Sequence, residues 1–181
     1  MSVVGGRDWS DVYELAKLID QTWVHGKKLY LCGNGGSAGN ACHLANDFLY
    51  GVAKGSGPGI KVESLSANTS VVTCLANDIG YGDIFAQQII VKAEQGDVLL
   101  ALSGSGESEN IIRAIQAATS VGAHTAAILG YSGGKAAKLA EYVIHFPVND
   151  MQIAEDLQLV VGHMCMQWLA NNRGKSVNTD N

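Results

Sequence analysis

Five short apolar runs along the chain constrain its fold more than any other feature. They cover residues 28–33, 60–65, 97–103, 124–130 and 142–147. A run of almost continuous apolarity, such as VLLAL, is typical of a strand buried on both faces. Because helical patterns separate the runs, the sequence predicts an α/β three-layer sandwich: a five-stranded parallel sheet with helices on both faces.

The remaining segments suggest where the chain is helical and where it is not. Residues 108–122 place apolar side chains at helical spacing after a serine and end at a glycine. A long closing helix is predicted from Asp150 to about Ala170, followed by a polar tail from about residue 171. The glycine-rich stretch 51–60 is predicted as a loop, either a plain connector or a cover over a substrate.

Size and charge narrow the class of protein. With 181 residues, 47% of them hydrophobic and 16% charged, we expect a single domain over residues 1–181. A net charge of −5 argues against a nucleic-acid partner, which needs a basic surface. No stretch reaches the ~20 apolar residues of a membrane span and no secretory pattern is present, so we expect no membrane partner and a cytoplasmic location.

The cysteines give a further expectation about the chain. Cys32, Cys42, Cys74 and Cys165 form no CxxC pair, and each lies among apolar or small residues. This pattern favours four buried free thiols over disulfides.

Two loops rich in glycine and serine follow the first and third predicted strands. They read GNGGSA, residues 33–38, and SGSGES, residues 103–108. Loops at the carboxyl ends of neighbouring parallel strands converge, and their N–H groups and hydroxyls suit an anion. Neither loop has a nucleotide-binding spacing, a lysine or an arginine, which favours a phosphate monoester and argues against a nucleotide cofactor. Alternatively, Ser103, Ser105 and Ser108 only cap the next helix.

Histidines and a carboxylate follow on predicted helices. His43 and Asp47 are one helical turn apart and therefore project from the same helix face. The pair suits acid–base chemistry, although such pairs also occur as solvated surface groups. His163, within VVGHMCM of the closing helix, is either a functional group or a core histidine.

Four stretches together resemble the SIS domain family, and more closely its phosphoheptose isomerases. They are CGNGGSA, ANDIGYGDIF, GDVLLALSGSGESENIIRAI and GGKAAKLAE, and the similarity extends from about Tyr30 to His163. The resemblance implies the SIS fold, which is similar to flavodoxin-like and Rossmann-like sandwiches. It also implies an aldose–ketose isomerase that converts sedoheptulose 7-phosphate to D-glycero-D-manno-heptose 7-phosphate through an enediol or enediolate, within heptose biosynthesis.

The resemblance also implies the residues of the substrate site. The expected phosphate-binding residues are Ser37, Ser103, Ser105 and Ser108. The expected neighbours of the substrate are Asn34, Gly35 and Gly36 in the first loop, Gly104 in the second, where the family often has threonine, and Asn77, Asp78 and Glu155 around the sugar. Family members are tetramers in which neighbouring chains complete the site, so a homo-oligomer is expected, with a tetramer favoured. The N-terminal region is shorter than in typical members by about one helix.

Catalysis and metal binding follow from the same resemblance. Asp47, where the family has glutamate, and His163 would form the catalytic pair. Some members bind zinc with corresponding residues, which implies one zinc per site held by His43, Asp47, Glu155 and His163. Glu155 stands where the family has glutamine, and eight residues rotate a helix position by about 80°. Asp156, closer to the face of His163, is therefore a rival ligand.

Two other functions remain open at this point. The chain is either an isomerase of another sugar phosphate, such as a pentose or hexose phosphate, or a non-catalytic relative that binds a protein or senses a sugar phosphate. Non-catalytic relatives tend to lose the carboxylate on the first of these helices. The retention of an acidic or imidazole group at all four positions favours the enzyme.

Overall fold

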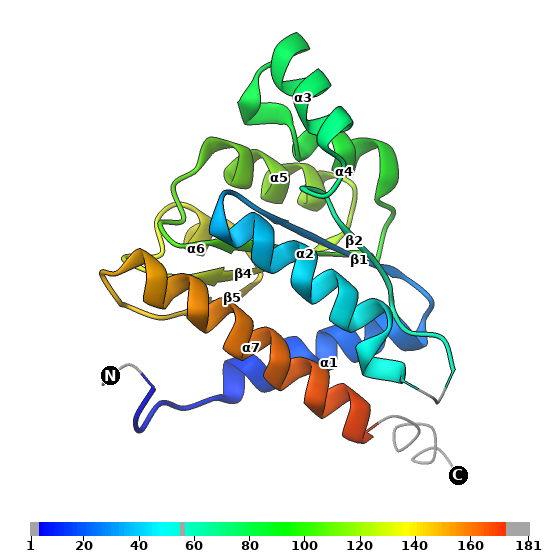
Figure 1. Cartoon of the computed structure of the whole chain (residues 1–181), viewed down its shortest axis with the longest axis vertical. Coiled ribbons are helices and arrows are strands. Elements are labelled where there is room, and N and C mark those ends of the chain that lie inside the picture. The colour runs from blue at the N-terminus through cyan, green and yellow to red at the C-terminus, as the bar shows by residue number, and fades with distance from the viewer. Residues whose placement is uncertain (1–3, 55–56, 173–181) are drawn as a thin grey trace.

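The computed structural model describes residues 4–54 and 57–172, which form a parallel sheet covered by helices (Figure 1). The strands are β1 (Lys28–Gly33), β2 (Lys61–Ser64), β3 (Val98–Ser103), β4 (His124–Leu129) and β5 (Tyr142–His145). They are all parallel, in the order β2-β1-β3-β4-β5. The predicted five-stranded parallel sheet is confirmed, and each strand lies within its predicted run.

The helices follow the strands as the alternating pattern predicts. They are α1 (Ser10–Val24), α2 (Gly36–Leu49), α3 (Thr69–Asp78), α4 (Ala86–Lys92), α5 (Glu109–Ser120), α6 (Ala136–Leu139) and α7 (Met151–Asn172), with 3-10 turns η1 (Gly51–Ala53) and η2 (Tyr81–Asp83). The predicted loop after the first crossover helix begins with η1, and its residues 55–56 lie outside the described residues. The closing helix continues to Asn172, and the rest of the predicted tail, from 173, also lies outside them.

Side chains alternate between two hydrophobic cores on opposite faces of the sheet. Leu31 and Leu100 pack in a core with residues of α1, α2 and α7. Cys32 and Ala101 point the other way, into a core with residues of α4 and α5. These two cores confirm the predicted three-layer sandwich.

Helices α2 and α7 lie side by side on one face of the sheet and run in the same direction (Figure 1). Gly162, inside α7, is buried against Leu44 of α2, and a Cβ atom at this glycine would overlap the leucine side chain. A glycine inside a helix costs stability, but here it lets two helices approach closely. The residues after Gly162 are therefore brought near the middle of α2.

Helix α3 has a different relation to the rest of the fold. It projects from one end of the molecule (Figure 1), and none of its residues is buried. It packs mainly against η2, which follows it in the chain. Val72, Leu75 and Ala76 pack against the rim of the second core but stay half-buried, so α3 has no fully buried side chain in the single chain.

The predicted state of the cysteines is partly wrong. All four are free thiols, but Cys42 and Cys74 are exposed. Cys42 Sγ lies 3.3 Å from Ser64 Oγ at the edge of the sheet, and Cys74 lies on the projecting α3. Cys32 and Cys165 are buried, and burial raises the pKa of each thiol to about 12. Across residues 4–54 and 57–172, no helix combines the length and apolarity that a membrane crossing requires.

Candidate active site

The loops after β1 and β3 line one cavity at the carboxyl edge of the sheet. The two strands are neighbours, with Gly33 paired to Leu102, so their following loops lie side by side. The cavity has a volume of about 230 Å³. Its lining residues are Asn34, Gly35, Ser37, Leu102, Ser103, Gly104, Ser105, Ser108, Met151 and Glu155.

The first loop directs the start of α2 toward this cavity. Gly35 has a φ of +56°, a left-handed conformation that favours glycine. Ala38 and Gly39 already donate their backbone N–H groups to the carbonyls of this loop. The N–H groups of Gly36 and Ser37, in the first turn of α2, have no partner within the helix and suit an anion.

In the second loop, hydroxyl groups fix the turn rather than cap the helix. Ser103 Oγ accepts the N–H of Gly106 at 3.0 Å, and Ser105 Oγ accepts that of Glu107 at 3.2 Å. Ser108 occupies the position before α5, but its side chain makes no capping hydrogen bond. Each accepting hydroxyl keeps its own hydrogen for donation, so this loop offers donors to the cavity.

A reciprocal amide pair ties the first loop to the first turn of α5. Asn34 Nδ2 donates to Asn110 Oδ1 at 2.9 Å, and Asn110 Nδ2 donates back to Asn34 Oδ1 at 2.8 Å. The Tyr81 hydroxyl also donates to Asn34 Oδ1, at 3.0 Å. These bonds fix the orientation of the Asn34 amide at the entrance to the cavity.

Glu155 gives the cavity an unusual charge for an anion site. Its carboxylate packs against the first loop so closely that a Cβ at Gly36 would overlap it. No lysine or arginine is among the residues that line the cavity. An anion bound here would be held by N–H and O–H groups alone, with one negative side chain beside it.

Asn77 and Asp78, expected beside the sugar, lie elsewhere in the single chain. Both are at the end of the projecting α3 and are exposed, and Asn77 Nδ2 donates to Asp78 Oδ1 at 2.9 Å. They are not among the residues that line the cavity.

The second part of the site lies farther along α2 and α7. The Nε2 atoms of His43 and His163 are 3.0 Å apart. Asp47 Oδ2 lies 3.3 Å from His43 Nε2 and 3.2 Å from His163 Nε2. The side chain of Asp47 is 18% exposed, whereas those of His43 and His163 are 51% and 40% exposed. We call these three residues the His–Asp–His cluster.

The geometry of the cluster suits a metal ion. Its three donor atoms lie within 4.8 Å of one another. Ligand atoms about 2.0–2.1 Å from a tetrahedral zinc ion are separated by about 3.3 Å, close to the distances found here. Among the described residues, this is the group of three or more histidine, cysteine or carboxylate side chains whose ligand atoms lie close enough together to hold a metal ion. The carboxylates of Glu155 and Asp156 are not part of it.

The cluster and the cavity are connected by α2. His43 follows Gly36 by two helical turns, and at 1.5 Å per residue this places them roughly 10 Å apart along the axis. A ligand whose anionic end occupied the cavity would therefore extend along α2 toward the cluster.

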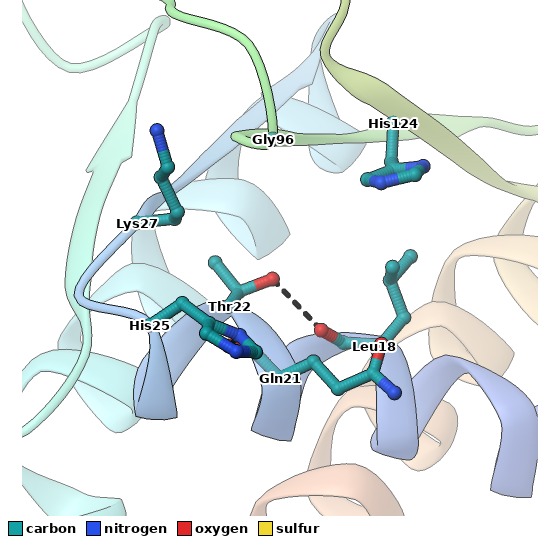
Figure 2. Close-up of a pocket in the computed structure, with 7 residues that line it drawn as sticks. All are labelled: Leu18, Gln21, Thr22, His25, Lys27, Gly96 and His124. Carbon is teal, nitrogen blue, oxygen red and sulfur yellow. Dashed lines mark hydrogen bonds between the residues drawn. The ribbon is translucent and has the colours of Figure 1, made fainter.

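A further cavity, of about 380 Å³, lies at the amino ends of the strands, on the opposite edge of the sheet (Figure 2). Its lining includes His25 and His124, whose Nδ1 atoms already contact Gln21 O and the Glu141 carboxylate at 2.8 and 2.9 Å. Thr22 Oγ1, at its base, donates to Leu18 O. Because it lies at the opposite edge, this cavity is separate from the site formed by the two loops and the cluster.

Several residues of the site were not identified from the sequence. Asn110 and Tyr81 orient the first loop, and Gly162 brings α7 to α2. Gln158 donates to Ser37 and accepts from Asn40. Each is a common residue type in a helix or turn and carries no motif. Only the glycine within VVGHMCM gave a local signal, since glycine inside a helix usually has a packing reason.

The fold and the serine-rich cavity define the class of protein to which the chain belongs. Residues 1–130 match the SIS domain family, and the chain is a member of this family.

Its relatives within the family are phosphoheptose isomerases. The chain is 35% identical over 154 residues to the phosphoheptose isomerase of Akkermansia muciniphila, covering 85% of this chain and 81% of the relative. It is 33% identical over 161 residues to that of Clostridium acetobutylicum, covering 88% and 81%. The solved structure of the phosphoheptose isomerase from Neisseria gonorrhoeae matches with a TM-score of 0.83 and 28% identity, over 90% of this chain and 86% of that one.

Proposed function

We propose that the chain is a phosphosugar aldose–ketose isomerase that converts sedoheptulose 7-phosphate to D-glycero-D-manno-heptose 7-phosphate, for heptose biosynthesis. The observation that carries this proposal is the position of the His–Asp–His cluster, two helical turns along α2 from a cavity of serine hydroxyls and helix N–H groups. The relatives named above support the choice of substrate. We infer that the sheet and its helices form a single domain.

In the cavity, Ser37, Ser103, Ser105 and Ser108 hold the phosphate. The first loop lines the cavity through Asn34, Gly35 and Ser37, and the start of α2 supplies backbone N–H donors beside the hydroxyls. Hydroxyl and amide donors hold a phosphate monoester without a magnesium ion, which fits a sugar phosphate better than a nucleotide. The sugar chain then extends along α2 toward the cluster, past Glu155.

The reaction moves one proton from C1 to C2 and another from the C1 oxygen to the C2 oxygen. A base removes the proton from C1 of the ketose while the C2 oxygen gains a proton, which gives an enediol. Protonation of C2 and loss of the proton from the C1 oxygen then give the aldose. We assign these transfers to Asp47 and His163, whose Oδ2 and Nε2 atoms lie 3.2 Å apart and, without a metal, can act on adjacent atoms of one substrate. With zinc held by these two atoms, the second carboxylate oxygen of Asp47 would remain for proton transfer.

The donor set of the cluster supports zinc as the metal. Two imidazole nitrogens and one carboxylate oxygen are typical zinc ligands, and three protein ligands are typical of a catalytic zinc site that keeps a position for substrate. When bound, zinc would polarise the substrate carbonyl and stabilise the negative charge of an enediolate. Glu155 would act as a neighbour of the sugar rather than as the fourth ligand.

A homo-oligomer, with a tetramer favoured, fits the exposure of the site. His43 and His163 are about half exposed, and Ile79 and Tyr81, next to α3, are 49% and 56% exposed. A second copy packed on this end would cover α3 and bring further residues to the sugar. Light scattering of the purified protein measures the number of chains directly.

The test of the proposed function is proton NMR of the purified protein with sedoheptulose 7-phosphate in deuterated water, with and without added zinc. Aldose signals together with deuterium at C1 or C2 are expected, because an enediol exchanges its carbon-bound proton with solvent. Binding of the sugar phosphate without product or exchange would contradict isomerase activity on this substrate. The same experiment with pentose and hexose phosphates then separates another isomerase from a sugar-phosphate sensor.

A further inference from the structure

Gln158 lies directly behind the hydroxyl of Ser37. Its Nε2 atom donates a hydrogen bond to Ser37 Oγ at 3.0 Å. Gln158 is 1% exposed and Ser37 is 3% exposed, so water does not compete for this bond. Gln158 is on α7 and does not line the cavity, whereas Ser37, on α2, does. Any effect of this glutamine on a ligand in the cavity must therefore pass through another residue.

The orientation of the Gln158 amide is fixed by the backbone. Asn40 Nδ2 donates to the carbonyl oxygen of Glu155 at 2.9 Å and to Gln158 Oε1 at 3.0 Å. Because a backbone carbonyl can only accept, the NH₂ group of Asn40 must face α7. It then requires an oxygen from Gln158, which turns the NH₂ group of Gln158 toward Ser37. Rotation of the Gln158 amide would place two NH₂ groups against each other.

This chain of hydrogen bonds determines what Ser37 can offer to a ligand. Its oxygen accepts from Gln158, so its hydroxyl hydrogen cannot be directed at the glutamine. Among the described residues, the side-chain hydrogen bond of Ser37 is this accepted one, and its hydroxyl lines the cavity. The hydroxyl is thereby held as a donor before any ligand binds.

We propose that Gln158 is a positioning residue that aims the Ser37 hydroxyl hydrogen at an oxygen of the bound phosphate, with Asn40 fixing its amide. The inference rests on the phosphate site of the proposed function and deepens it. A donor whose direction is already fixed loses less rotational freedom on binding, so its hydrogen bond contributes more to affinity.

The test is a double-mutant cycle on the affinity for inorganic phosphate, measured by calorimetry on the full chain. Gln158→Met keeps the size of the side chain and removes its donor, and we expect the Kd to rise about 3- to 10-fold, the range of one hydrogen bond. In the Ser37→Ala background the same substitution should change the Kd less than about twofold, because the hydroxyl through which it acts is absent. An equal rise in both backgrounds, or no rise in either, would overturn the proposal.

Two further variants separate positioning from folding. Gln88→Met removes another buried glutamine, 4% exposed, whose amide donates to Leu65 O and Ile84 O away from the cavity, and should leave the phosphate Kd unchanged. Asn40→Ala leaves the NH₂ group of Gln158 in place but removes the hydrogen bond that fixes its orientation. We therefore expect a smaller rise in the phosphate Kd than in Gln158→Met, and this rise should also disappear in the Ser37→Ala background. If Gln158→Met does not fold, the cycle of Asn40→Ala with Ser37→Ala decides the question.

The outcomes also separate this inference from the proposed function. A wild-type protein that does not bind phosphate would contradict the phosphate site itself. Phosphate binding with an additive cycle would contradict only the role of Gln158. With an active enzyme, Gln158→Met should raise KM for the sugar phosphate with little change in kcat, since the phosphate is held equally in the ground state and transition state.

Discussion

The carboxylate of Asp47 lies 3.2 Å from the imidazole Nε2 of His163, although the two residues belong to different helices. Helix α2 alone brings His43 and Asp47 together, and its contact with α7 adds His163. The contact between these helices forms the His–Asp–His cluster, to which we assign the chemistry.

Removal of either member of this pair should abolish most of the isomerase activity. We expect Asp47→Asn and His163→Ala each to lower kcat by about 10²- to 10⁴-fold, the usual contribution of a positioned acid or base. The control is Asp156→Asn, an exposed carboxylate of α7 outside the cluster, which should retain wild-type kcat. Turnover followed by NMR measures both, and a Asp47→Asn variant with wild-type kcat would rule out that carboxylate as the base.

The cluster should bind zinc with one ion per chain. His43→Ala removes a ligand and should weaken zinc binding by more than about 100-fold, because loss of an outer-shell partner alone costs about 10- to 100-fold. His25→Ala, which removes an exposed histidine in the further cavity, is the matched control. Calorimetric titration with zinc measures both affinities, and equal affinities for the two variants would place the metal elsewhere.

The negative charge of Glu155 should weaken phosphate binding in the cavity. Glu155→Gln removes this charge and should tighten the binding of inorganic phosphate about fivefold at low salt, since two unit charges 4 Å apart in water repel by about 1 kcal/mol. Asp156→Asn, its exposed neighbour in sequence, should change the affinity less than about twofold. Weaker phosphate binding by Glu155→Gln would mean that the carboxylate supports the site instead.

A methyl group at position 162 should separate the two helices that carry the cluster. Gly162→Ala places a Cβ against the buried Leu44, and overpacking of this kind costs about 1–3 kcal/mol of unfolding free energy. We expect zinc affinity and kcat to fall together, because His163 follows directly. Gly39→Ala, whose Cβ would meet no atom within 4 Å, is the control for a glycine replacement in a helix. Unchanged zinc affinity in Gly162→Ala would show that the cluster does not depend on this contact.

The buried thiols should make the protein less stable at alkaline pH. The pKa of Cys32 and of Cys165 is about 12 in the folded state, above the ordinary thiol value of 9.0. Above pH 9 the unfolded chain therefore loses protons that the folded chain keeps, so this contribution to stability is present below pH 9 and is lost as the pH rises toward 12. Each thiol lowers the unfolding free energy by up to about 1.4 kcal/mol per pH unit in this window.

Urea denaturation between pH 9 and 11 tests this expectation. The double variant Cys32→Ala/Cys165→Ala should show a shallower fall of unfolding free energy with pH than the wild type, even though its stability at pH 7 is lower. Cys42→Ala, which removes an exposed thiol, should keep the wild-type slope. Identical slopes for the double variant and the wild type would contradict the burial of these thiols.

The sequence predicted the sheet well because each strand is a local apolar run whose flanking glycines and polar residues limit it. It also indicated the pairing of the two loops, since parallel strands have equivalent carboxyl ends. The family resemblance indicated that His43, Asp47 and His163 meet across two helices, but it also placed Glu155 with them. Glu155 and His163 belong to the same helix but contact different parts of α2. Glu155 packs against Gly36 at the start of α2, and His163 contacts His43 two turns farther along, because the two helices run side by side.

Exposure and amide networks were the least predictable features. Cys74 has apolar neighbours in sequence, but only one side of α3, with Val72 and Leu75, touches the core, and Cys74 is exposed, so the local pattern predicted the wrong burial. Gln158 is a polar residue at an apolar position of α7, and its hydrogen bonds with Ser37 and Asn40 of α2 explain its burial. Such a contact depends on the distance between helices, which in turn depends on one glycine.

The cluster also joins distant parts of the polypeptide, because 120 residues separate His43 from His163. An ion or substrate that bridges them closes a loop containing most of the sheet. The folded chain has already lost the entropy of closing this loop, whereas the unfolded chain would lose it on binding, so the ligand binds the folded chain more tightly. Occupation of the site would therefore act as a reversible crosslink between the first crossover helix and the last helix. Partial unfolding that detaches α7 would release the ligand and dismantle the catalytic group in the same event.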